Sequence, residues 1–150
     1  MEEKSPVAVN GVLQVCVVVK DLEQSMESYQ RLVGIGDWKV FTVEPPSLNG
    51  TLRGKQQAFS MKIALTRVGD MQWELIQPLN GPSIYREFLD TTGEGLHHVK
   101  FAVDDHDKAV ADFARHGVGV LMGGDVEDRG FSYMDTQSAL GFTLEVIYRK

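Results

Sequence analysis

Apolar residues recur with two different periods in the first half of the chain. Residues 13–19 contain four β-branched valines in a mostly apolar run, which predicts a strand. Leu22, Met26 and Tyr29 follow at helical spacing, and Gly34 marks the expected end of that helix. Further extended stretches are predicted at residues 38–43, 59–68 and 71–77. The first half therefore has the predicted order β-α-β-β-β.

The second half repeats this order. Residues 14–21 are matched 84 positions later by residues 98–105, and the correspondence continues through the following helix, where Arg31 matches Arg115. A short helix at 82–89 is expected to link the halves. The elements predicted after it are a strand at 96–103, a helix at 105–116 and strands at 119–122, 131–135 and 142–148. The sequence thus contains an internal duplication.

One segment has no counterpart in this scheme. Residues 44–57 are rich in proline, glycine and polar residues, which predicts a long loop. Arg53 and Lys55 lie within it, so the loop is a candidate to close over a bound substrate. Disorder is the competing interpretation.

Strand alternation assigns a direction to the polar side chains. Gln14 and His98 occupy equivalent positions in the two first strands, and Glu74 and Glu145 lie in the two last strands. Period-two alternation places all four on the face opposite the helices. An internal twofold relation would make such matched positions converge on one point.

The same alternation adds neighbours to this face. Cys16 and Lys100 share it with Gln14 and His98, whereas His97 is expected on the opposite face. In the strand at 59–68 the apolar residues are assigned to the helix side, so Lys62 is expected beside the four candidates.

Two glutamates that project together into a sheet require a compensating positive charge. A divalent metal supplies it, with Gln14, Glu74, His98 and Glu145 as one nitrogen and three oxygen donors. This mixed set suits Mn, Co, Ni, Fe, Mg or an expanded Zn site and does not distinguish among them. Open positions would let a substrate chelate the ion and would stabilise an enolate.

Composition narrows the function classes. With 150 residues, 43% of them hydrophobic, the chain is sized for one compact domain made of a module at 11–79, a linker at 80–93 and a module at 94–150. A net charge of −6 argues against nucleic acid and membrane partners. No apolar run approaches the roughly 18 residues of a membrane span, and the amino terminus lacks a secretory pattern, so a cytoplasmic location is expected. The single cysteine excludes an intrachain disulfide.

These features resemble the vicinal oxygen chelate superfamily. The tandem modules, the matched ligand positions and the sequence Gly-Glu-Gly-Leu-His-His-Val at 93–99 carry the resemblance, which extends from about Leu13 to Tyr148. It implies an α+β fold in which two βαβββ modules form a cupped, partly open eight-stranded sheet around a metal site. It also implies a homodimer.

Within that superfamily the linker and the His-His sequence resemble the methylmalonyl-CoA epimerase branch. The ligand set of Gln14, Glu74, His98 and Glu145 instead resembles that of glyoxalase I. The epimerases carry a catalytic glutamate on the third strand of the first module, where this chain has Lys62. The resemblance therefore leaves Lys62, or Glu44 on the neighbouring loop, as the replacement acid or base.

The resemblance and the donor set together favour an isomerase, epimerase or lyase that removes a proton next to a carbonyl. Glu145 is the preferred base, and Lys62, Lys100 and Cys16 are the expected contacts of a small anionic, CoA-linked or thiol-linked substrate. A metal-free or metal-assisted small-molecule binding or resistance protein is the alternative. A ring-cleaving dioxygenase is disfavoured because Gln14 interrupts the two-histidine, one-carboxylate set that such iron sites use.

Overall fold

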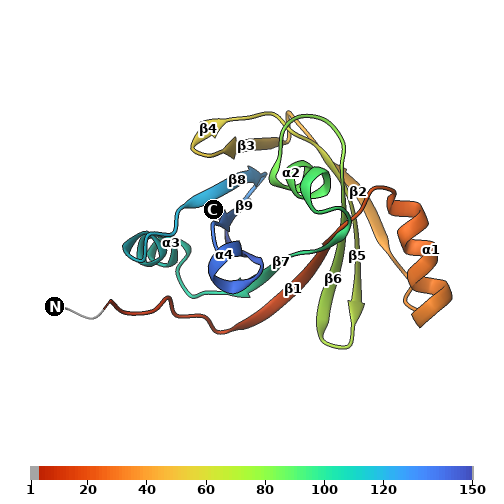
Figure 1. Cartoon of the computed structure of the whole chain (residues 1–150), viewed down its shortest axis with the longest axis horizontal. Helices are drawn as coiled ribbons and strands as arrows, with labels where there is room; N and C mark the ends of the chain where they lie inside the picture. Colours follow the sequence, from red (N-terminus) through yellow and green to blue (C-terminus); the bar gives the residue numbers. More distant parts are fainter. Residues whose placement is uncertain (1–3, 150) are drawn as a thin grey trace.

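The computed structural model describes residues 4–149, and within them it contains two βαβββ modules joined by a helix (Figure 1). The first module consists of β1 (Gly11–Val18), α1 (Leu22–Val33), β2 (Lys39–Val43), β5 (Met61–Val68) and β6 (Met71–Pro78). The linker helix is α2 (Ile84–Thr91). The second module consists of β7 (Gly95–Ala102), α3 (His106–Arg115), β8 (Val120–Val126), β9 (Arg129–Met134), α4 (Gln137–Leu140) and β10 (Thr143–Arg149). The predicted tandem arrangement is confirmed.

The duplication extends to the helix caps. The Asp21 carboxylate accepts a hydrogen bond from the Gln24 amide at 3.1 Å at the start of α1. Asp105, at the equivalent position of the repeat, accepts from the Lys108 amide at 3.0 Å at the start of α3. Each cap satisfies an amide that has no partner inside the helix. The matching caps start both helices at the same point after their strands.

One continuous sheet joins the modules. β1 pairs in parallel with β6, β7 pairs in parallel with β10, and β1 and β7 pair antiparallel at the centre. This arrangement relates the halves by a pseudo-twofold axis between β1 and β7. It brings the two first strands, which carry Gln14 and His98, side by side.

The segment at 44–57 is where the fold departs from expectation. It contains β3 (Leu48–Leu52) and β4 (Lys55–Gln56), which form a hairpin, and β3 pairs antiparallel with β8 of the second module. The predicted loop is therefore wrong over residues 48–56, which form this hairpin. The sheet has ten strands rather than eight, in the order β2-β5-β6-β1-β7-β10-β9-β8-β3-β4.

Two contacts hold the hairpin in place. Leu48 is buried in the same core as Phe59 and Tyr133. At the tip, Arg53 donates two hydrogen bonds to the Glu87 carboxylate of α2, at 2.7 and 2.8 Å. Arg53 and Gly54 both have positive φ, as a tight hairpin turn of this hand requires. The hairpin is thus part of the packed sheet.

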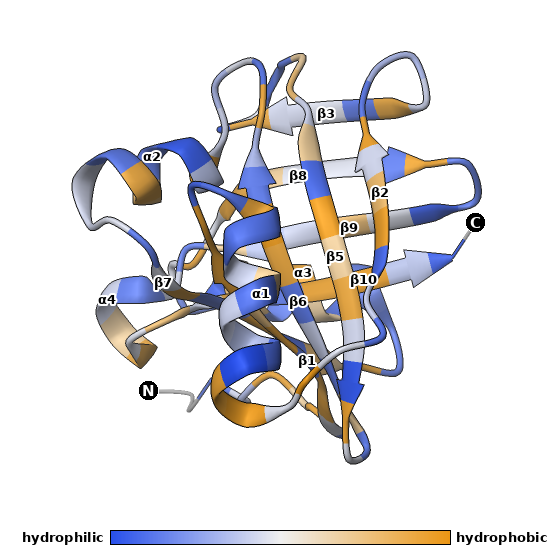
Figure 2. Cartoon of the chain, turned by 90° about the vertical axis from the view of Figure 1, so that its right-hand side faces the viewer, coloured by the Kyte–Doolittle hydropathy of each residue, from blue (hydrophilic) through white to orange (hydrophobic). Residues whose placement is uncertain are grey.

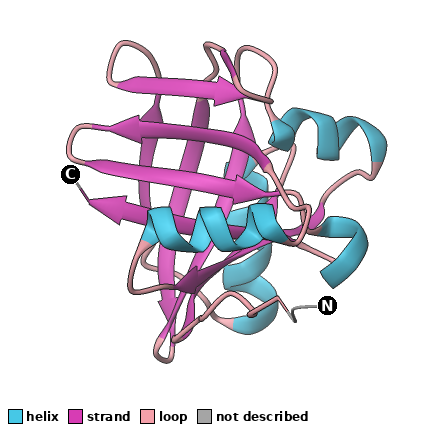
Figure 3. Cartoon of the chain, turned by 90° about the vertical axis from the view of Figure 1, so that its left-hand side faces the viewer, coloured by secondary structure: helices cyan, strands magenta, loops and turns pink. Residues whose placement is uncertain are grey.

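The curled sheet separates an inner core from two outer ones. Figure 2 shows α1 against the outer face of β5 and β6, where Leu22, Ala64 and Leu75 are buried. Figure 3 shows the opposite side, where α3 lies along the strands of the second module. The inner face of the curl is also apolar, and α2 inserts Tyr85 into it. No helix between residues 4 and 149 is long and apolar enough to cross a membrane.

Candidate metal centre

Three of the four predicted metal ligands converge on the inner face of the sheet. His98 Nε2 lies 3.3 Å from Glu74 Oε1 and 3.5 Å from Glu145 Oε1. The three residues come from β7, β6 and β10, which are brought together by the pairings of the central strands. All three are buried, with exposed fractions of 7% for Glu74, 1% for His98 and 5% for Glu145.

Two atoms of this cluster lack hydrogen-bond partners. His98 Nε2 and Glu145 Oε1 are both buried and make no hydrogen bond within residues 4–149. Burial raises the pKa of Glu145, while Lys100 and His98 oppose that rise. Orphaned buried donors and acceptors are costly, and one divalent cation would satisfy both atoms. The residues present therefore fit a metal ion.

Gln14 and Cys16 flank this cluster. Gln14 is buried and faces inward as predicted, but its amide donates a hydrogen bond to Gln72 Oε1. Cys16 pairs in register with both Glu74 and His98, and the candidate ligand atoms of these three residues lie within 4.8 Å of one another. Cys16 therefore competes with Gln14 as a fourth donor. Burial, followed by the nearby Glu74 carboxylate, raises the pKa of the Cys16 thiol.

His97 is on the inner side of the sheet, contrary to the prediction. The pairing register of β1 and β7 shifts between Cys16 and Val17, and this irregularity breaks the alternation at His97. The His97 ring contacts Phe88 and lies with its Nδ1 2.8 Å from His98 Nδ1. Burial lowers the pKa of His97 to about 2, so its ring is neutral.

The histidine pair bears on which nitrogen of His98 is available to a metal ion. If His98 Nδ1 carries the proton and donates to His97 Nδ1, the lone pair of His98 Nε2 faces the two glutamates. Such an outer hydrogen bond is the usual means of orienting a ligating histidine. The sequence shows the two adjacent histidines, but strict alternation along the strand predicts the wrong face for His97.

Lys62 faces α1 and not the cluster, contrary to the prediction. In the register of β5 with β6 it pairs with Gln77, and its Nζ lies 3.2 Å from Glu23 Oε1 of α1. The inward positions of β5 are taken by Met61 and Ile63. The prediction assumed that apolar residues mark only the helix side, whereas the interior of the curl is apolar as well.

The other predicted site residues divide between the inner face and the surface. Lys100 pairs in register with Gln14 and Glu145, which places it on the inner face as expected. Glu44 is exposed at the turn before β3, and its carbonyl accepts a hydrogen bond from the Leu48 amide. Glu44 is therefore outside the cluster, and its predicted role has no geometric support.

Two tyrosines complete the cluster. The hydroxyls of Tyr85, from α2, and Tyr133, from β9, lie 2.6 Å apart in the core. Tyr133 pairs with Glu145, and its ring centroid is 4.8 Å from that of His98. Burial raises the pKa of both phenols, which keeps them neutral donors. Sequence patterns gave no signal for them, because aromatic residues in a core are ordinary.

A cavity of about 760 Å³ lies beside Gln72, the hydrogen-bond partner of Gln14, and none of the three ligand residues lines it. Gln72 and Leu65 line it, and both lie on the strand face that carries Glu74. Lys39, Arg67 and Arg129 also line it, with Asp37 as the opposing charge. The charged residues around this cavity are thus predominantly cationic.

Comparison with known sequences identifies a family for this fold. Residues 13–134 match the family described as the Glyoxalase/Bleomycin resistance protein/Dioxygenase superfamily. A curated relative, the uncharacterised protein YqjC of Bacillus subtilis, is 26% identical over 92 residues. That match covers 61% of this chain and 56% of the relative, so it spans little more than half of the relative's length.

Solved structures resemble the whole chain. A variant of Streptomyces coelicolor methylmalonyl-CoA epimerase, in complex with 2-nitronate-propionyl-CoA, has a TM-score of 0.64 and 19% identity, covering 93% of this chain and 97% of the other. Methylmalonyl-CoA epimerase from Mycobacterium tuberculosis has a TM-score of 0.63 and 19% identity, with coverages of 99% and 93%. The hypothetical protein BH1468 of Bacillus halodurans has a TM-score of 0.63 and 20% identity, with coverages of 93% and 94%. At these identities the likeness establishes the fold.

Proposed function

Because the chain belongs to the Glyoxalase/Bleomycin resistance protein/Dioxygenase superfamily, we propose that its buried cluster is the active site of a divalent-metal-dependent isomerase, epimerase or lyase. The observation that carries this proposal is the convergence of Glu74, His98 and Glu145 with two unsatisfied buried atoms among them. Two buried carboxylates and an unpaired imidazole nitrogen destabilise the fold unless a bound cation compensates their charge.

Glu74, His98 and Glu145 would hold the ion, with Gln14 or Cys16 as a further donor. A bound divalent cation acts as a Lewis acid that stabilises negative charge on a substrate carbonyl oxygen. The chain's own residues position the ligands. His97 orients His98, and the strand pairings fix the glutamates.

Glu145 is the proposed base. Its Oε1 has no hydrogen-bond partner in the described structure, and burial raises its pKa, which makes the carboxylate a stronger base. It would take the proton from the carbon next to the carbonyl at Oε1, released from the ion during turnover. The neutral hydroxyls of Tyr133 and Tyr85 lie beside it and would keep bulk water from the protonated carboxyl group.

The charge around the cavity indicates the substrate class. Lys39, Arg67 and Arg129 line the cavity, and Lys100 lies on the inner face near Glu145. Cations clustered at a cleft attract and orient an anionic substrate. We therefore propose a small anionic, CoA-linked or thiol-linked acyl compound. The epimerases that share the fold, one of them bound to a nitronate analogue of an acyl-CoA, support this choice.

Hydrogen exchange into a substrate tests the proposal. Methylmalonyl-CoA is the first probe, incubated in D2O with protein purified without chelator, and deuterium at its C2 is measured by mass spectrometry. Glu145→Gln should lower the exchange rate at least about 100-fold, the lower end of general-base contributions. Glu27→Gln, an exposed change on α1, is the matched control and should exchange as the wild type does.

Metal content provides the independent readout. We expect about one divalent ion per chain by elemental analysis and a fall in melting temperature when EDTA removes it. Protein that contains no divalent ion after metal supplementation, and whose melting temperature ignores EDTA, contradicts the proposal. That outcome would favour a metal-free binding protein.

A further inference from the structure

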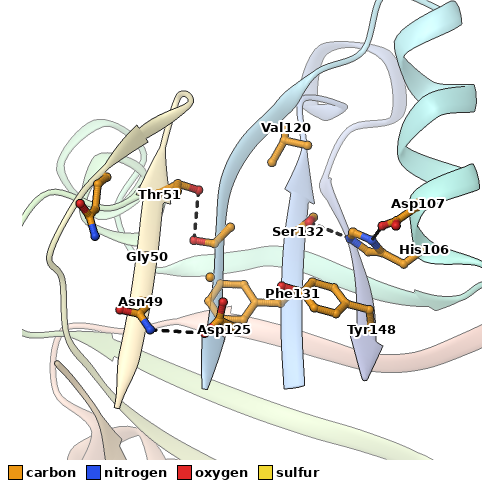
Figure 4. Close-up of a pocket in the computed structure, with 13 residues that line it drawn as sticks. Asn49, Gly50, Thr51, His106, Asp107, Val120, Asp125, Phe131, Ser132 and Tyr148 are labelled. Atoms are coloured by element: carbon orange, nitrogen blue, oxygen red, sulfur yellow. Dashed lines mark hydrogen bonds and ion pairs between the residues drawn. The ribbon is translucent and has the colours of Figure 1, made fainter. Parts of the chain in front are cut away.

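A second polar array lies on the outer face of the second module, away from the metal centre. A cavity of about 460 Å³ lies over β3, β8 and β9, beside the amino-terminal end of α3 (Figure 4). Ser132, His106 and Asp107 line it together. Ser132 pairs with Val146 of the outer core, whereas the next residue, Tyr133, faces the inner cluster. The two sites thus occupy opposite faces of β9.

The three side chains form a connected hydrogen-bond series. His106 Nε2 lies 2.9 Å from Ser132 Oγ, and His106 Nδ1 lies 2.8 Å from Asp107 Oδ1. An ionised carboxylate only accepts hydrogen bonds, so it favours the tautomer with the proton on Nδ1. His106 Nε2 is then the acceptor for the Ser132 hydroxyl, which is the geometry of a nucleophile next to an oriented base.

We propose that Ser132 is the nucleophile of an acyl-transfer site, with His106 as its general base and Asp107 as a positioning residue. The His106 ring is held by Tyr148, whose centroid lies 4.6 Å away, and by its position in the first turn of α3. A base fixed by packing as well as by hydrogen bonds needs little reorganisation in the reaction.

The cavity leaves room beside the hydroxyl. Gly123 is the register partner of Ser132, and a Cβ added there would lie 3.1 Å from the Phe131 carbonyl oxygen and 3.9 Å from Ser132 Oγ. Glycine at this position therefore avoids a side chain that would crowd the Ser132 hydroxyl. Thr51 Oγ1 lies in the same cavity, on the other side of Gly123, and makes only a long hydrogen bond of 3.4 Å. It is a donor that can turn toward a developing oxyanion.

The charge of the cavity selects the substrate. Asp107, with a side chain that is 97% exposed, adds a negative charge to the rim of the cavity beside His106. Carboxylates disfavour an anionic substrate, so the site suits small neutral or cationic esters. This preference is opposite to that of the cationic cavity beside Gln72. The inference is therefore independent of the proposed function.

The reaction follows directly from the array. Ser132 Oγ attacks the ester carbonyl carbon while its proton passes to His106 Nε2, and a bond from Oγ to carbon forms. The carbon–oxygen bond to the alcohol then breaks, and the alcohol leaves with the proton from His106. Water, deprotonated by His106, hydrolyses the acyl-serine and restores the hydroxyl.

Covalent labelling of the full-length protein tests the site. The probes are 4-nitrophenyl acetate and a fluorophosphonate, both used in the presence of EDTA so that metal-dependent hydrolysis does not contribute. We expect an adduct on Ser132 by peptide mapping, and 4-nitrophenol release that Ser132→Ala and His106→Gln each lower about 100-fold. Asp107→Ala should lower the rate less, because Asp107 is exposed to solvent, and Asp107→Glu should restore it.

Matched controls separate this site from surface chemistry. Ser138→Ala on α4 and His116→Gln after α3 should leave labelling and release unchanged. Ser132→Cys, which keeps a nucleophile at the position, should still accept the acetyl group and guards against misfolding of the alanine variant. An adduct only at other residues, or equal release from wild type and Ser132→Ala, overturns the proposal.

Discussion

At the scale of single residues, the metal centre consists of polar groups placed in an apolar interior. Glu74, His98 and Glu145 satisfy each other only in part, and His97 Nδ1 lies 2.8 Å from His98 Nδ1. Burying polar groups without partners costs folding free energy, so their presence in the core points to a role beyond folding. Each neighbour of the cluster therefore has a measurable consequence.

His97 should make stability depend on pH. Its pKa is about 2 in the folded state and about 6.5 in the unfolded state. Below pH 6.5 only the unfolded chain takes up this proton. The free energy of unfolding therefore decreases as the pH is lowered, by up to about 1.4 kcal/mol per pH unit. Urea unfolding of the EDTA-treated protein at pH 7, 6 and 5 measures the slope.

The pH slope of the unfolding free energy should correspond to about one proton fewer in His97→Gln than in the wild type. His116→Gln, at an exposed position, should retain more of the wild-type slope. Identical pH slopes for wild type and His97→Gln would show that His97 does not stay neutral in the folded protein.

Cys16 and Gln14 can be distinguished as donors with cobalt. The thiol lies in the same 4.8 Å cluster as Glu74 and His98, whereas the Gln14 amide is engaged with Gln72. We expect Co²⁺ loading to give a near-ultraviolet thiolate-to-metal absorption band that Cys16→Ser abolishes. Gln14→Ala should keep the band, and a wild-type complex without it assigns the fourth position to oxygen.

Alternation along strands predicted the direction of most site residues correctly. Gln14, Cys16, Glu74, His98 and Glu145 all face inward, because regular pairing preserves the period of two. Alternation gives the wrong face for His97, where the pairing register shifts, and for Lys62, because both faces of β5 are apolar. A register shift depends on the partner strand, and sequence periodicity within one strand contains no information about it.

At the scale of elements, the β3–β4 hairpin is the addition that the repeat does not explain. Its strands were invisible in the sequence because their partner, β8, lies far along the chain: the Asn49 and Asp125 side chains that contact each other are 76 residues apart. Proline and glycine at its ends suggested a loop, and the pairing with β8 overrides that local tendency.

The hairpin should contribute to global stability. Leu48 is 3% exposed in the inner core, so Leu48→Ala should cost about 2–5 kcal/mol of unfolding free energy. Asn49→Ala, at the exposed neighbouring position, should stay within about 0.5 kcal/mol of the wild type. Chemical denaturation measures both. Equal stabilities for the two variants would mean that the hairpin is only loosely docked.

At the scale of the whole molecule, the two modules are parts of one structure. They share a sheet through β1 and β7, and β3 of the first module completes the edge of the second at β8. The metal ligands come from both halves, since Glu74 belongs to one and His98 and Glu145 to the other. Neither half contains a complete cluster.

Separated halves should therefore fold only together. Fragments 1–93 and 94–150 are each expected to lack cooperative unfolding and to regain it on mixing, because β1 requires β7 and β3 requires β8. Co-purification through a tag on one fragment and thermal unfolding measure this. The matched control is the full chain carrying a protease site at the same junction, compared before and after cleavage. A fragment 1–93 that unfolds cooperatively alone would contradict the expectation.

The β3–β8 pairing also imposes an order on synthesis. The hairpin leaves the ribosome well before the strand it pairs with. The hydrogen bond from the Thr51 hydroxyl to the Gly123 carbonyl cannot form until 72 more residues have been synthesised. Until then a strand with an apolar residue at its start has an open edge, which is a template for pairing with other chains. Nascent chains that stall before residue 120 are thus the state of this protein most prone to aggregate, and the one in which chaperone binding would matter most.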